Sequence, residues 1–190
     1  MDISSSKAVE ALKRGDVAAA KEIFEAMAAA RNAVGYTGLA SIYERGEGGI
    51  AQDFEKARYW YERDFCETGS PVAACALARI YFFGRGVAVD YEKAFCYYSK
   101  IIRTDLWPSS LLRLGIMYEV GQGTAKNHQR ARALYRRSAR LGNIYARKHW
   151  AVMEIKHGNC ICGTLLWAYA IIQDAPLAFI NSNHKRFRVS

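Results

Sequence analysis

Proline and low-complexity sequence are scarce in this chain of 190 residues. Only three prolines occur, 51% of the residues are apolar, and no stretch is rich in serine, glutamine or proline. Disordered linkers have the opposite composition, because they cannot bury enough apolar surface to fold. The length is sufficient for one domain with a sizeable core. We therefore expect the whole chain to fold as one structural domain.

Long hydrophobic runs are also missing. Residues 1–16 alternate between charged and apolar side chains, unlike the apolar core of a secretory signal. The most apolar stretch, residues 163–172, has half the length of about twenty residues that a membrane span needs. We interpret this stretch as a buried terminal helix, and we expect a cytoplasmic protein without a transmembrane segment.

Recognisable catalytic motifs are absent. The sequence contains no glycine-rich phosphate loop, no nucleophile elbow and no His-Glu metalloprotease spacing. Three Gly-x-Gly pairs occur, but each follows an expected helix, which is typical of turns rather than of nucleotide binding. We therefore expect that the protein is not an enzyme and has no cofactor.

Cysteines are few and irregularly spaced, and their odd number favours reduced thiols over a disulfide framework. They are Cys66, Cys75, Cys96, Cys160 and Cys162. Together with His149 and His157, the last two are the only candidate metal ligands, with His157, Cys160 and Cys162 as the candidate site. Cys-x-Cys is tighter than the usual structural zinc spacing. We favour the interpretation of partly buried thiols beside a turn.

Acidic residues are scarce in the second half of the chain. Residues 1–100 carry 13 Lys/Arg and 14 Asp/Glu, a net charge of −1, whereas residues 101–190 carry 14 and 4, a net charge of +10. No acidic residue occurs between Val120 and Met153, a stretch that contains eight basic ones. One end of the molecule is therefore expected to be strongly electropositive.

An internal repeat dominates residues 33–142. Tyr43, Tyr81 and Tyr118 recur at spacings of 38 and 37 residues. Other positions recur in the same register: the glycine pairs Gly46/Gly48, Gly84/Gly86 and Gly121/Gly123; then Asp53, Asp90 and Asn127; Ala57, Ala94 and Ala131; and Tyr61, Tyr98 and Tyr135. Periods of this length are typical of repeat architectures.

Each repeat unit has the pattern of a helical hairpin. Small residues and a leucine before the first tyrosine form a stripe that lets a second helix approach closely. The glycines can end this first helix, helix A, in the left-handed conformation. Asp53, Asp90 and Asn127 stand where the N-cap of a second helix, helix B, is needed. The pattern therefore predicts an all-α solenoid of antiparallel helix pairs.

The pattern resembles the Sel-one-like repeat (SLR), a relative of the tetratricopeptide repeat with an all-α superhelical fold. The third repeat matches the signature at Leu114, Gly115, Tyr118, Gly121, Gly123, Ala131, Tyr135, Ala139 and Gly142, and departs where Asn127 and Arg130 replace Asp and Lys. The resemblance implies a binding scaffold for proteins or peptides. Small SLR proteins are common in bacteria, where they act in signalling, in host interaction and as immunity proteins.

The repeat register divides the chain into five segments. Residues 33–69, 70–107 and 108–142 are the three clear repeats. Residues 1–32 form a shortened hairpin in which Gly15 ends the first helix and Asp16 caps the second. Residues 143–190 hold a degenerate fourth repeat, in which Glu154 replaces the tyrosine, a terminal helix and a basic tail. Atypical end units are expected because they cover the face that neighbouring repeats would otherwise bury.

The resemblance implies a concave binding surface lined by the A helices. If the Leu-Gly-Tyr stripe packs inward, positions six and two before the tyrosine and one after it face this groove. They are Thr37, Ser41 and Glu44; Cys75, Arg79 and Phe82; Leu112, Ile116 and Glu119; and Lys148, Val152 and Ile155. Their mixed chemistry suits a protein or peptide better than a metabolite. We take Ser41, Arg79, Phe82, Leu112, Ile116, Lys148 and Val152 as the candidate partner-binding residues, each of which could equally pack against a neighbouring repeat.

The basic stretch permits several interpretations. Its candidate residues are Arg130, Arg132, Arg136, Arg137 and Arg140, and three of them recur every four residues as one row on the convex side. A solvated face that aids solubility is the simplest reading, and an acidic protein partner is the next. Binding of nucleic acid or an anionic surface is the alternative function, although no base-reading motif accompanies the charge.

Overall fold

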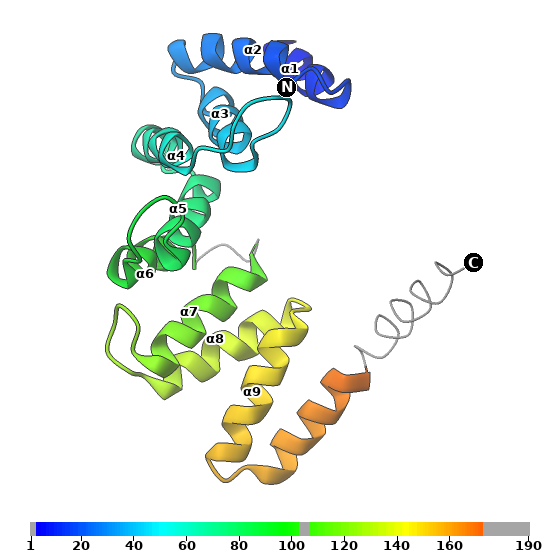
Figure 1. Ribbon diagram of the computed structural model, residues 1–190. Coiled ribbons are helices and arrows are strands. Elements are labelled where there is room, and N and C mark those ends of the chain that lie inside the picture. The colour runs from blue at the N-terminus through cyan, green and yellow to red at the C-terminus, as the bar shows by residue number, and fades with distance from the viewer. Residues whose placement is uncertain (1–2, 103–106, 173–190) are drawn as a thin grey trace, which may run out of the picture. The chain divides into compact units, whose positions relative to one another are not determined.

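The computed structural model describes residues 3–102 and 107–172, and within these ranges all regular secondary structure is helical (Figure 1). Although the sequence favoured one structural domain, the chain divides into two compact units. Unit 1 is Met1–Ile101 and unit 2 is Ile102–Ser190. The expected all-α fold is confirmed, and none of the helices in the described ranges is both long and apolar enough to cross a membrane.

Unit 1 consists of three antiparallel hairpins. Their helices are α1 (Ile3–Lys13) and α2 (Val17–Ala29), α3 (Ala33–Arg45) and α4 (Phe54–Thr68), and α5 (Pro71–Phe83) and α6 (Tyr91–Ile101). Each helix packs on the next one along the chain. The first core cluster joins the first three helices: Ala8, Val17, Ala20, Phe24, Met27, Ala28, Tyr36, Leu39 and Ile42.

Unit 2 repeats the same plan. Its helices are α7 (Pro108–Val120), α8 (His128–Arg140), α9 (Ile144–Lys156) and a further helix at residues 160–172, which we call the 160–172 helix. Ala131, Tyr135 and Met153 form its core cluster, with Trp150 packed against them. The basic tail at residues 184–188 lies outside the described residues.

The B helices begin at the expected caps. The side chains of Asp53, Asp90 and Asn127 each accept a hydrogen bond, 2.9 Å long, from the backbone N–H three residues further on. Asp16 does the same for Ala19 at 3.0 Å. These bonds satisfy N–H groups that have no partner inside the helix, so the caps inferred from the sequence are confirmed.

Two features of the fold depend on glycine, because any other residue would be strained at these positions. Gly84 ends α5 with φ of 66°, in the left-handed region expected of a C-cap. Gly115 lies in the middle of α7, where a Cβ would lie 2.6 Å from Cε1 of Tyr135. This absence of a side chain lets α8 approach α7 closely, which explains the small residues of the repeat stripe.

Candidate functional site

The candidate binding residues of unit 1 lie on the A helices α3 and α5. Ser41 is half-buried on α3, whereas Arg79 and Phe82 lie on α5. The Arg79 side chain keeps 43% of its surface exposed and forms an ion pair with Glu44. This pair joins α3 to α5 and gives the guanidinium a fixed place on the surface.

Glu44 is an acceptor shared by three elements of unit 1. Its carboxylate accepts a 2.8 Å hydrogen bond from the Tyr61 hydroxyl, pairs with Arg79, and lies 3.4 Å from the Arg85 guanidinium. Burial, followed by the charge of Glu44, raises the pKa of Tyr61 above its usual range. The phenol therefore stays protonated and remains a donor, and Glu44 ties the first clear repeat to the second.

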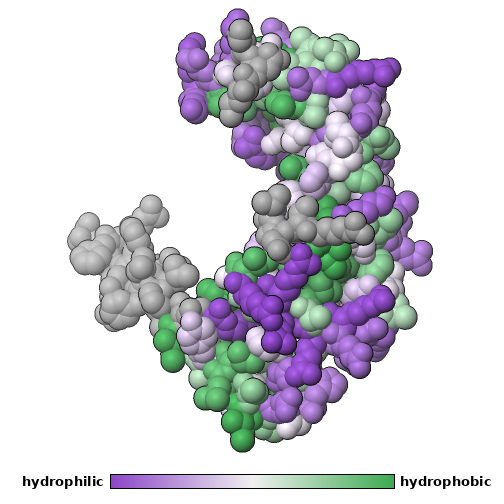
Figure 2. Space-filling model, turned by 180° about the vertical axis from the view of Figure 1, so that it is seen from behind, coloured by the Kyte–Doolittle hydropathy of each residue, from purple (hydrophilic) through white to green (hydrophobic). Residues whose placement is uncertain are grey.

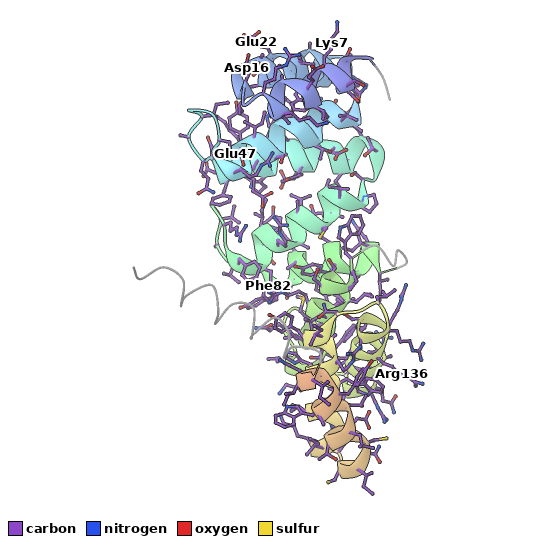
Figure 3. The ribbon with its side chains drawn as sticks, turned by 90° about the vertical axis from the view of Figure 1, so that its right-hand side faces the viewer. Lys7, Asp16, Glu22, Glu47, Phe82 and Arg136 are labelled. Atoms are coloured by element: carbon purple, nitrogen blue, oxygen red, sulfur yellow. The ribbon has the colours of Figure 1, made fainter. Side chains whose placement is uncertain are left out.

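Phe82 belongs to an aromatic cluster at the end of α5 (Figure 3). Its ring meets Phe83 at 5.1 Å, Tyr91 at 5.5 Å and Tyr98 at 6.4 Å between centroids, all close to edge-to-face. Phe83 is 45% exposed, and the Arg85 guanidinium lies 5.6 Å from its ring centroid. Unit 1 thus presents aromatic rings and cations within one short stretch of α5 and its turn.

The candidate binding residues of unit 2 are more embedded. Leu112 and Ile116 on α7 are half-buried against the unit 2 core cluster. Lys148 on α9 is half-buried, with its Nζ 5.9 Å from the ring centroid of Tyr145, and Val152 is 40% exposed. The α7 pair therefore contributes to packing, which leaves less of its surface for a ligand.

Three of the positions that could either face the groove or pack against a neighbouring element form a hydrogen bond to the following B helix. Glu44 is held by Tyr61, and Glu119 accepts a 2.6 Å hydrogen bond from the Tyr135 hydroxyl. Thr37 likewise donates to the buried carboxylate of Asp64 at 2.8 Å. The reason is that a carboxylate one residue after the A-helix tyrosine lies within reach of the B-helix phenol.

The basic row on α8 does not face solvent alone. Arg132 binds the carboxylate of Glu154 on α9, with Nη2 to Oε2 at 2.6 Å, and the guanidinium of Arg136 lies 5.9 Å from the Trp150 ring centroid. Arg130 donates to the Tyr118 hydroxyl at 3.1 Å. Arg137 is half-buried and Arg140 is exposed. Part of the expected convex row therefore stabilises the packing of α8 on α9.

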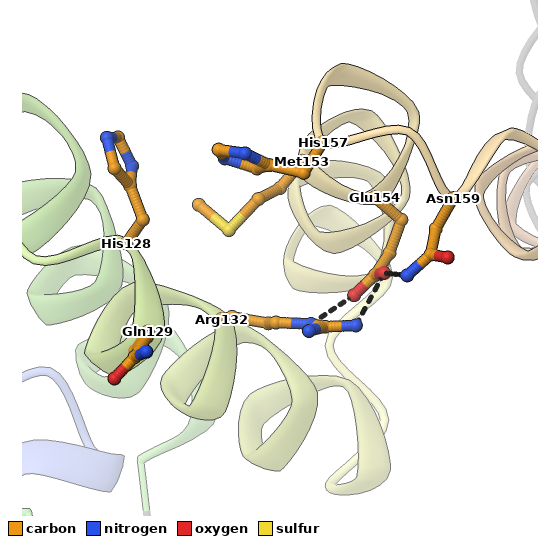
Figure 4. Close-up of a pocket in the computed structure, with 7 residues that line it drawn as sticks. All are labelled: His128, Gln129, Arg132, Met153, Glu154, His157 and Asn159. Atoms are coloured by element: carbon orange, nitrogen blue, oxygen red, sulfur yellow. Dashed lines mark hydrogen bonds and ion pairs between the residues drawn. The ribbon is translucent and has the colours of Figure 1, made fainter.

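A pocket of about 260 Å³ opens between the start of α8 and the end of α9 (Figure 4). The residues that line it are His128, Gln129, Arg132, Met153, Glu154, His157 and Asn159. The two histidine rings lie 5.3 Å apart between centroids, and both residues are exposed. The pocket combines one carboxylate, one guanidinium and two imidazoles.

Glu154 is the buried charge of this pocket, with 3% of its surface exposed. Burial alone would raise the pKa of Glu154, but hydrogen bonds from Asn159, Arg132 and Trp150 outweigh it and lower the pKa. The Trp150 indole N–H donates at 2.7 Å and the Asn159 amide at 2.9 Å. The carboxylate is thus neutralised by its own surroundings and ties α8, α9 and the next turn together.

The metal candidate gains no support from the geometry. Within the described ranges, no three His, Cys, Asp or Glu side chains gather as a metal ion would require. Cys160 and Cys162 are both exposed at the start of the 160–172 helix. The structure therefore does not bring His157, Cys160 and Cys162 together as ligands.

Sequence reasoning missed the contacts of three carboxylates that join helices, those of Glu44, Glu119 and Glu154, although the repeat register carried a signal for the first two. Repeats one and three have Glu44 and Glu119 directly after the tyrosine, and both have tyrosine at the facing B-helix position. The second repeat has Phe82 there, and its ring meets Tyr98 instead. A comparison of these two columns would have predicted the Tyr–Glu contacts. Nothing comparable marked Glu154, whose partners come from three different elements.

Comparisons with known proteins agree with the repeat register. The model of the Sel1 repeat family matches residues 28–63, 71–103 and 108–143, which confirms the resemblance to SLR proteins. No curated protein sequence matches the chain.

Three solved structures show the same fold. One is c5321, a protective antigen of uropathogenic Escherichia coli strains displaying an SLR fold, with a TM-score of 0.72 and 22% identity over 81% of this chain and 33% of that chain. A Sel1 repeat protein from Oxalobacter formigenes gives 0.68 and 20%, over 83% and 65% respectively. MamA gives 0.64 and 16%, over 94% and 98%. The chain thus spans a third of c5321 and just under two thirds of the Oxalobacter protein.

Proposed function

The chain belongs to the Sel1 repeat family, and we propose that it is an interaction scaffold that binds a partner protein or peptide through its A helices. Proteins with Sel1 repeats generally act as protein–protein interaction scaffolds. Its role would be that of an adaptor, a regulator or an immunity-type inhibitor, without catalysis. No disulfide links the five cysteines, all of which lie in the described ranges, and this supports the cytoplasm as its compartment.

The observation that carries the proposal is the surface of α5 around Arg79 and Phe82. A guanidinium fixed by Glu44 can still offer its exposed N–H groups to a second carboxylate. The adjacent aromatic cluster offers apolar area, and arginine and aromatic residues are the types that dominate binding energy at interfaces. We therefore propose a partner that presents an acidic side chain next to an apolar one. Ser41, Leu112, Ile116, Lys148 and Val152 remain candidates for further contacts, each within its own unit.

Peptides selected from a random display library on the full-length protein would test this surface. Arg79→Gln and Phe82→Ala should each weaken binding of the selected peptides by about tenfold, the scale of one good interface contact. Arg63→Gln is the matched control, because Arg63 lies on helix B α4 and its side chain is 42% exposed, close to the 43% of Arg79. Equal affinity of all three variants and the wild type would exclude this surface.

The competing function is binding of nucleic acid or an anionic surface through the basic half of the chain. The arginine row of α8 gives this function less support, because Arg132 and Arg136 already contact α9. The two functions differ in their salt dependence, since release of counterions makes nucleic-acid affinity fall steeply with ionic strength. Binding that persists at 0.5 M salt would favour the α5 surface.

A further inference from the structure

The 160–172 helix exposes apolar side chains that no described part of the chain covers. No charged residue occurs between residues 160 and 172. Ile161 is 79% exposed, Leu165 66% and Ile172 68%. Only a narrow stripe is buried, at Gly163 and Ala170. A helix that is apolar on all sides is normally buried on all sides, so this exposure indicates that something else covers it.

Among the four repeats that follow residue 32, the register shows that this apolar character is specific to the degenerate fourth repeat. Asn159 stands where Asp53, Asp90 and Asn127 cap the other B helices, and Gly163 holds the buried position of their alanines. Two and three residues after the cap, these four B helices are exposed. There the first three carry Glu55-Lys56, Glu92-Lys93 and Gln129-Arg130, whereas the fourth carries Ile161-Cys162. Polar side chains have thus been replaced by apolar ones on an outward face.

A following repeat would not cover this face. Helix α8 shows what a following repeat covers, because the A helix of the next repeat, α9, packs on it through Arg132 and Arg136. Nevertheless Gln129, Ala133 and Arg140 remain exposed. These three occupy the positions that Ile161, Leu165 and Ile172 occupy in the degenerate fourth repeat. Ile161, Leu165 and Ile172 therefore lie on an outward side of the 160–172 helix and not on the side where a further repeat would pack.

The unit that carries this face is strongly basic. Among the described residues of unit 2, the acidic side chains are Glu119 and Glu154, and both are bound internally by hydrogen bonds. The Arg147 guanidinium lies 4.7 Å from the ring centroid of Tyr169, and Lys156 is exposed at the end of α9. Figure 2 shows hydrophobic side chains gathered over this end of unit 2. A complementary partner must be both apolar and anionic.

We propose that the apolar face formed by Ile161, Leu165, Tyr169 and Ile172 inserts into the surface of an anionic phospholipid bilayer. Aliphatic and aromatic side chains on one helix face, together with nearby Lys and Arg, are the features of an interfacial helix. Anionic headgroups would neutralise the basic residues while the acyl boundary takes up the apolar ones. A second copy of the chain would bring a second basic surface, which disfavours self-association. The inference does not depend on the α5 surface.

The test is co-sedimentation of the full-length protein with vesicles of phosphatidylglycerol and phosphatidylcholine, and with vesicles of phosphatidylcholine alone. We expect binding to the mixed vesicles that is at least about tenfold stronger than to neutral ones, as electrostatic attraction of a few basic residues provides. The triple variant Ile161→Ser, Leu165→Ser and Ile172→Ser should lose at least about tenfold in affinity, because these side chains supply the inserted apolar area. Thermal unfolding by circular dichroism should remain near that of the wild type, since all three side chains are exposed.

The matched control is a second triple variant, Val34→Ser, Val72→Ser and Val89→Ser. It removes apolar side chains of unit 1 that are 44%, 45% and 50% exposed, so it should bind vesicles as the wild type does. Wild-type protein that fails to sediment with anionic vesicles, or equal loss in both triple variants, would overturn the proposal. So would a dimer in analytical ultracentrifugation that the Ile161/Leu165/Ile172 variant dissociates, because a second copy would then occupy the face.

Discussion

Units 1 and 2 share the helical hairpin but differ in how they handle charge. Among the described residues, unit 1 holds nine ion pairs, from Arg14–Glu10 to Lys93–Asp90, whereas unit 2 holds one, between Arg132 and Glu154. The backbone of the repeat tolerates both patterns because its core is built from small and aromatic residues. The surface charge can therefore differ between the two units while the fold of the repeat stays the same.

Substitution of the carboxylates of Glu154 in unit 2 and Glu44 in unit 1 tests this difference most directly. Glu154→Gln turns an amide donor toward Arg132, Trp150 and Asn159, which are donors themselves. We expect a loss of about 1–3 kcal/mol in the free energy of unfolding, measured by urea denaturation. Glu44→Gln should cost less, about 1 kcal/mol, because water can hydrate the partly exposed guanidiniums of Arg79 and Arg85.

Glu55→Gln is the control for both variants. Glu55 is exposed in the first turn of α4, so its replacement should change the unfolding free energy by only a few tenths of a kcal/mol. Equal destabilisation by all three substitutions would mean that burial of the carboxylate does not determine how much it contributes to the free energy of unfolding.

Lowering the pH should reveal the contribution of the Glu154 carboxylate as well, with a smaller change in the free energy of unfolding. The pKa of Glu154 is lowered in the folded protein, so its contribution to stability is present above the unfolded value near 4.5 and is lost as the pH falls through the lower folded value. The gap in unfolding free energy between wild type and Glu154→Gln should therefore narrow between pH 5 and pH 3, measured by urea midpoints. Glu10, Asp53, Glu67 and Asp90 also have lowered pKa values, but they titrate in both proteins and cancel. A gap that stays constant with pH would contradict a lowered pKa of Glu154 in the folded protein.

A change in salt concentration should produce the smallest change in the free energy of unfolding. Screening weakens the exposed ion pairs of unit 1 but also relieves repulsion among the arginines of α8. The double variant Arg130→Gln and Arg140→Gln removes two exposed charges from this row. Raising the salt from 0.05 to 0.5 M should stabilise the wild type relative to this variant by a few tenths of a kcal/mol, measured by thermal unfolding. A larger salt gain in the variant would show that the row is not under repulsion.

The pattern of the chain predicted the hairpins because their determinants are local. A cap such as Asp90 binds a backbone group three residues away, and Gly84 ends its helix through its own φ angle. Periodicity also placed Tyr98 and Tyr135 in the core, where they are 2% and 0% exposed. The candidate surface was only partly predictable, since helical spacing cannot distinguish a side chain that stays partly exposed, such as Arg79, from one that is bound internally, such as Glu44.

The sequence by itself determined the helical class, the repeat register, the caps and the concentration of basic residues in the second half of the chain. Tertiary structure alone decided where those charges are used, because Glu154 collects donors from α8, α9 and the turn that follows. It also decided that residues 163–172, which the sequence suggested were buried, are largely exposed. The physical reason is that burial of a helix depends on what packs against it, and the order of its own residues specifies only which side can be covered.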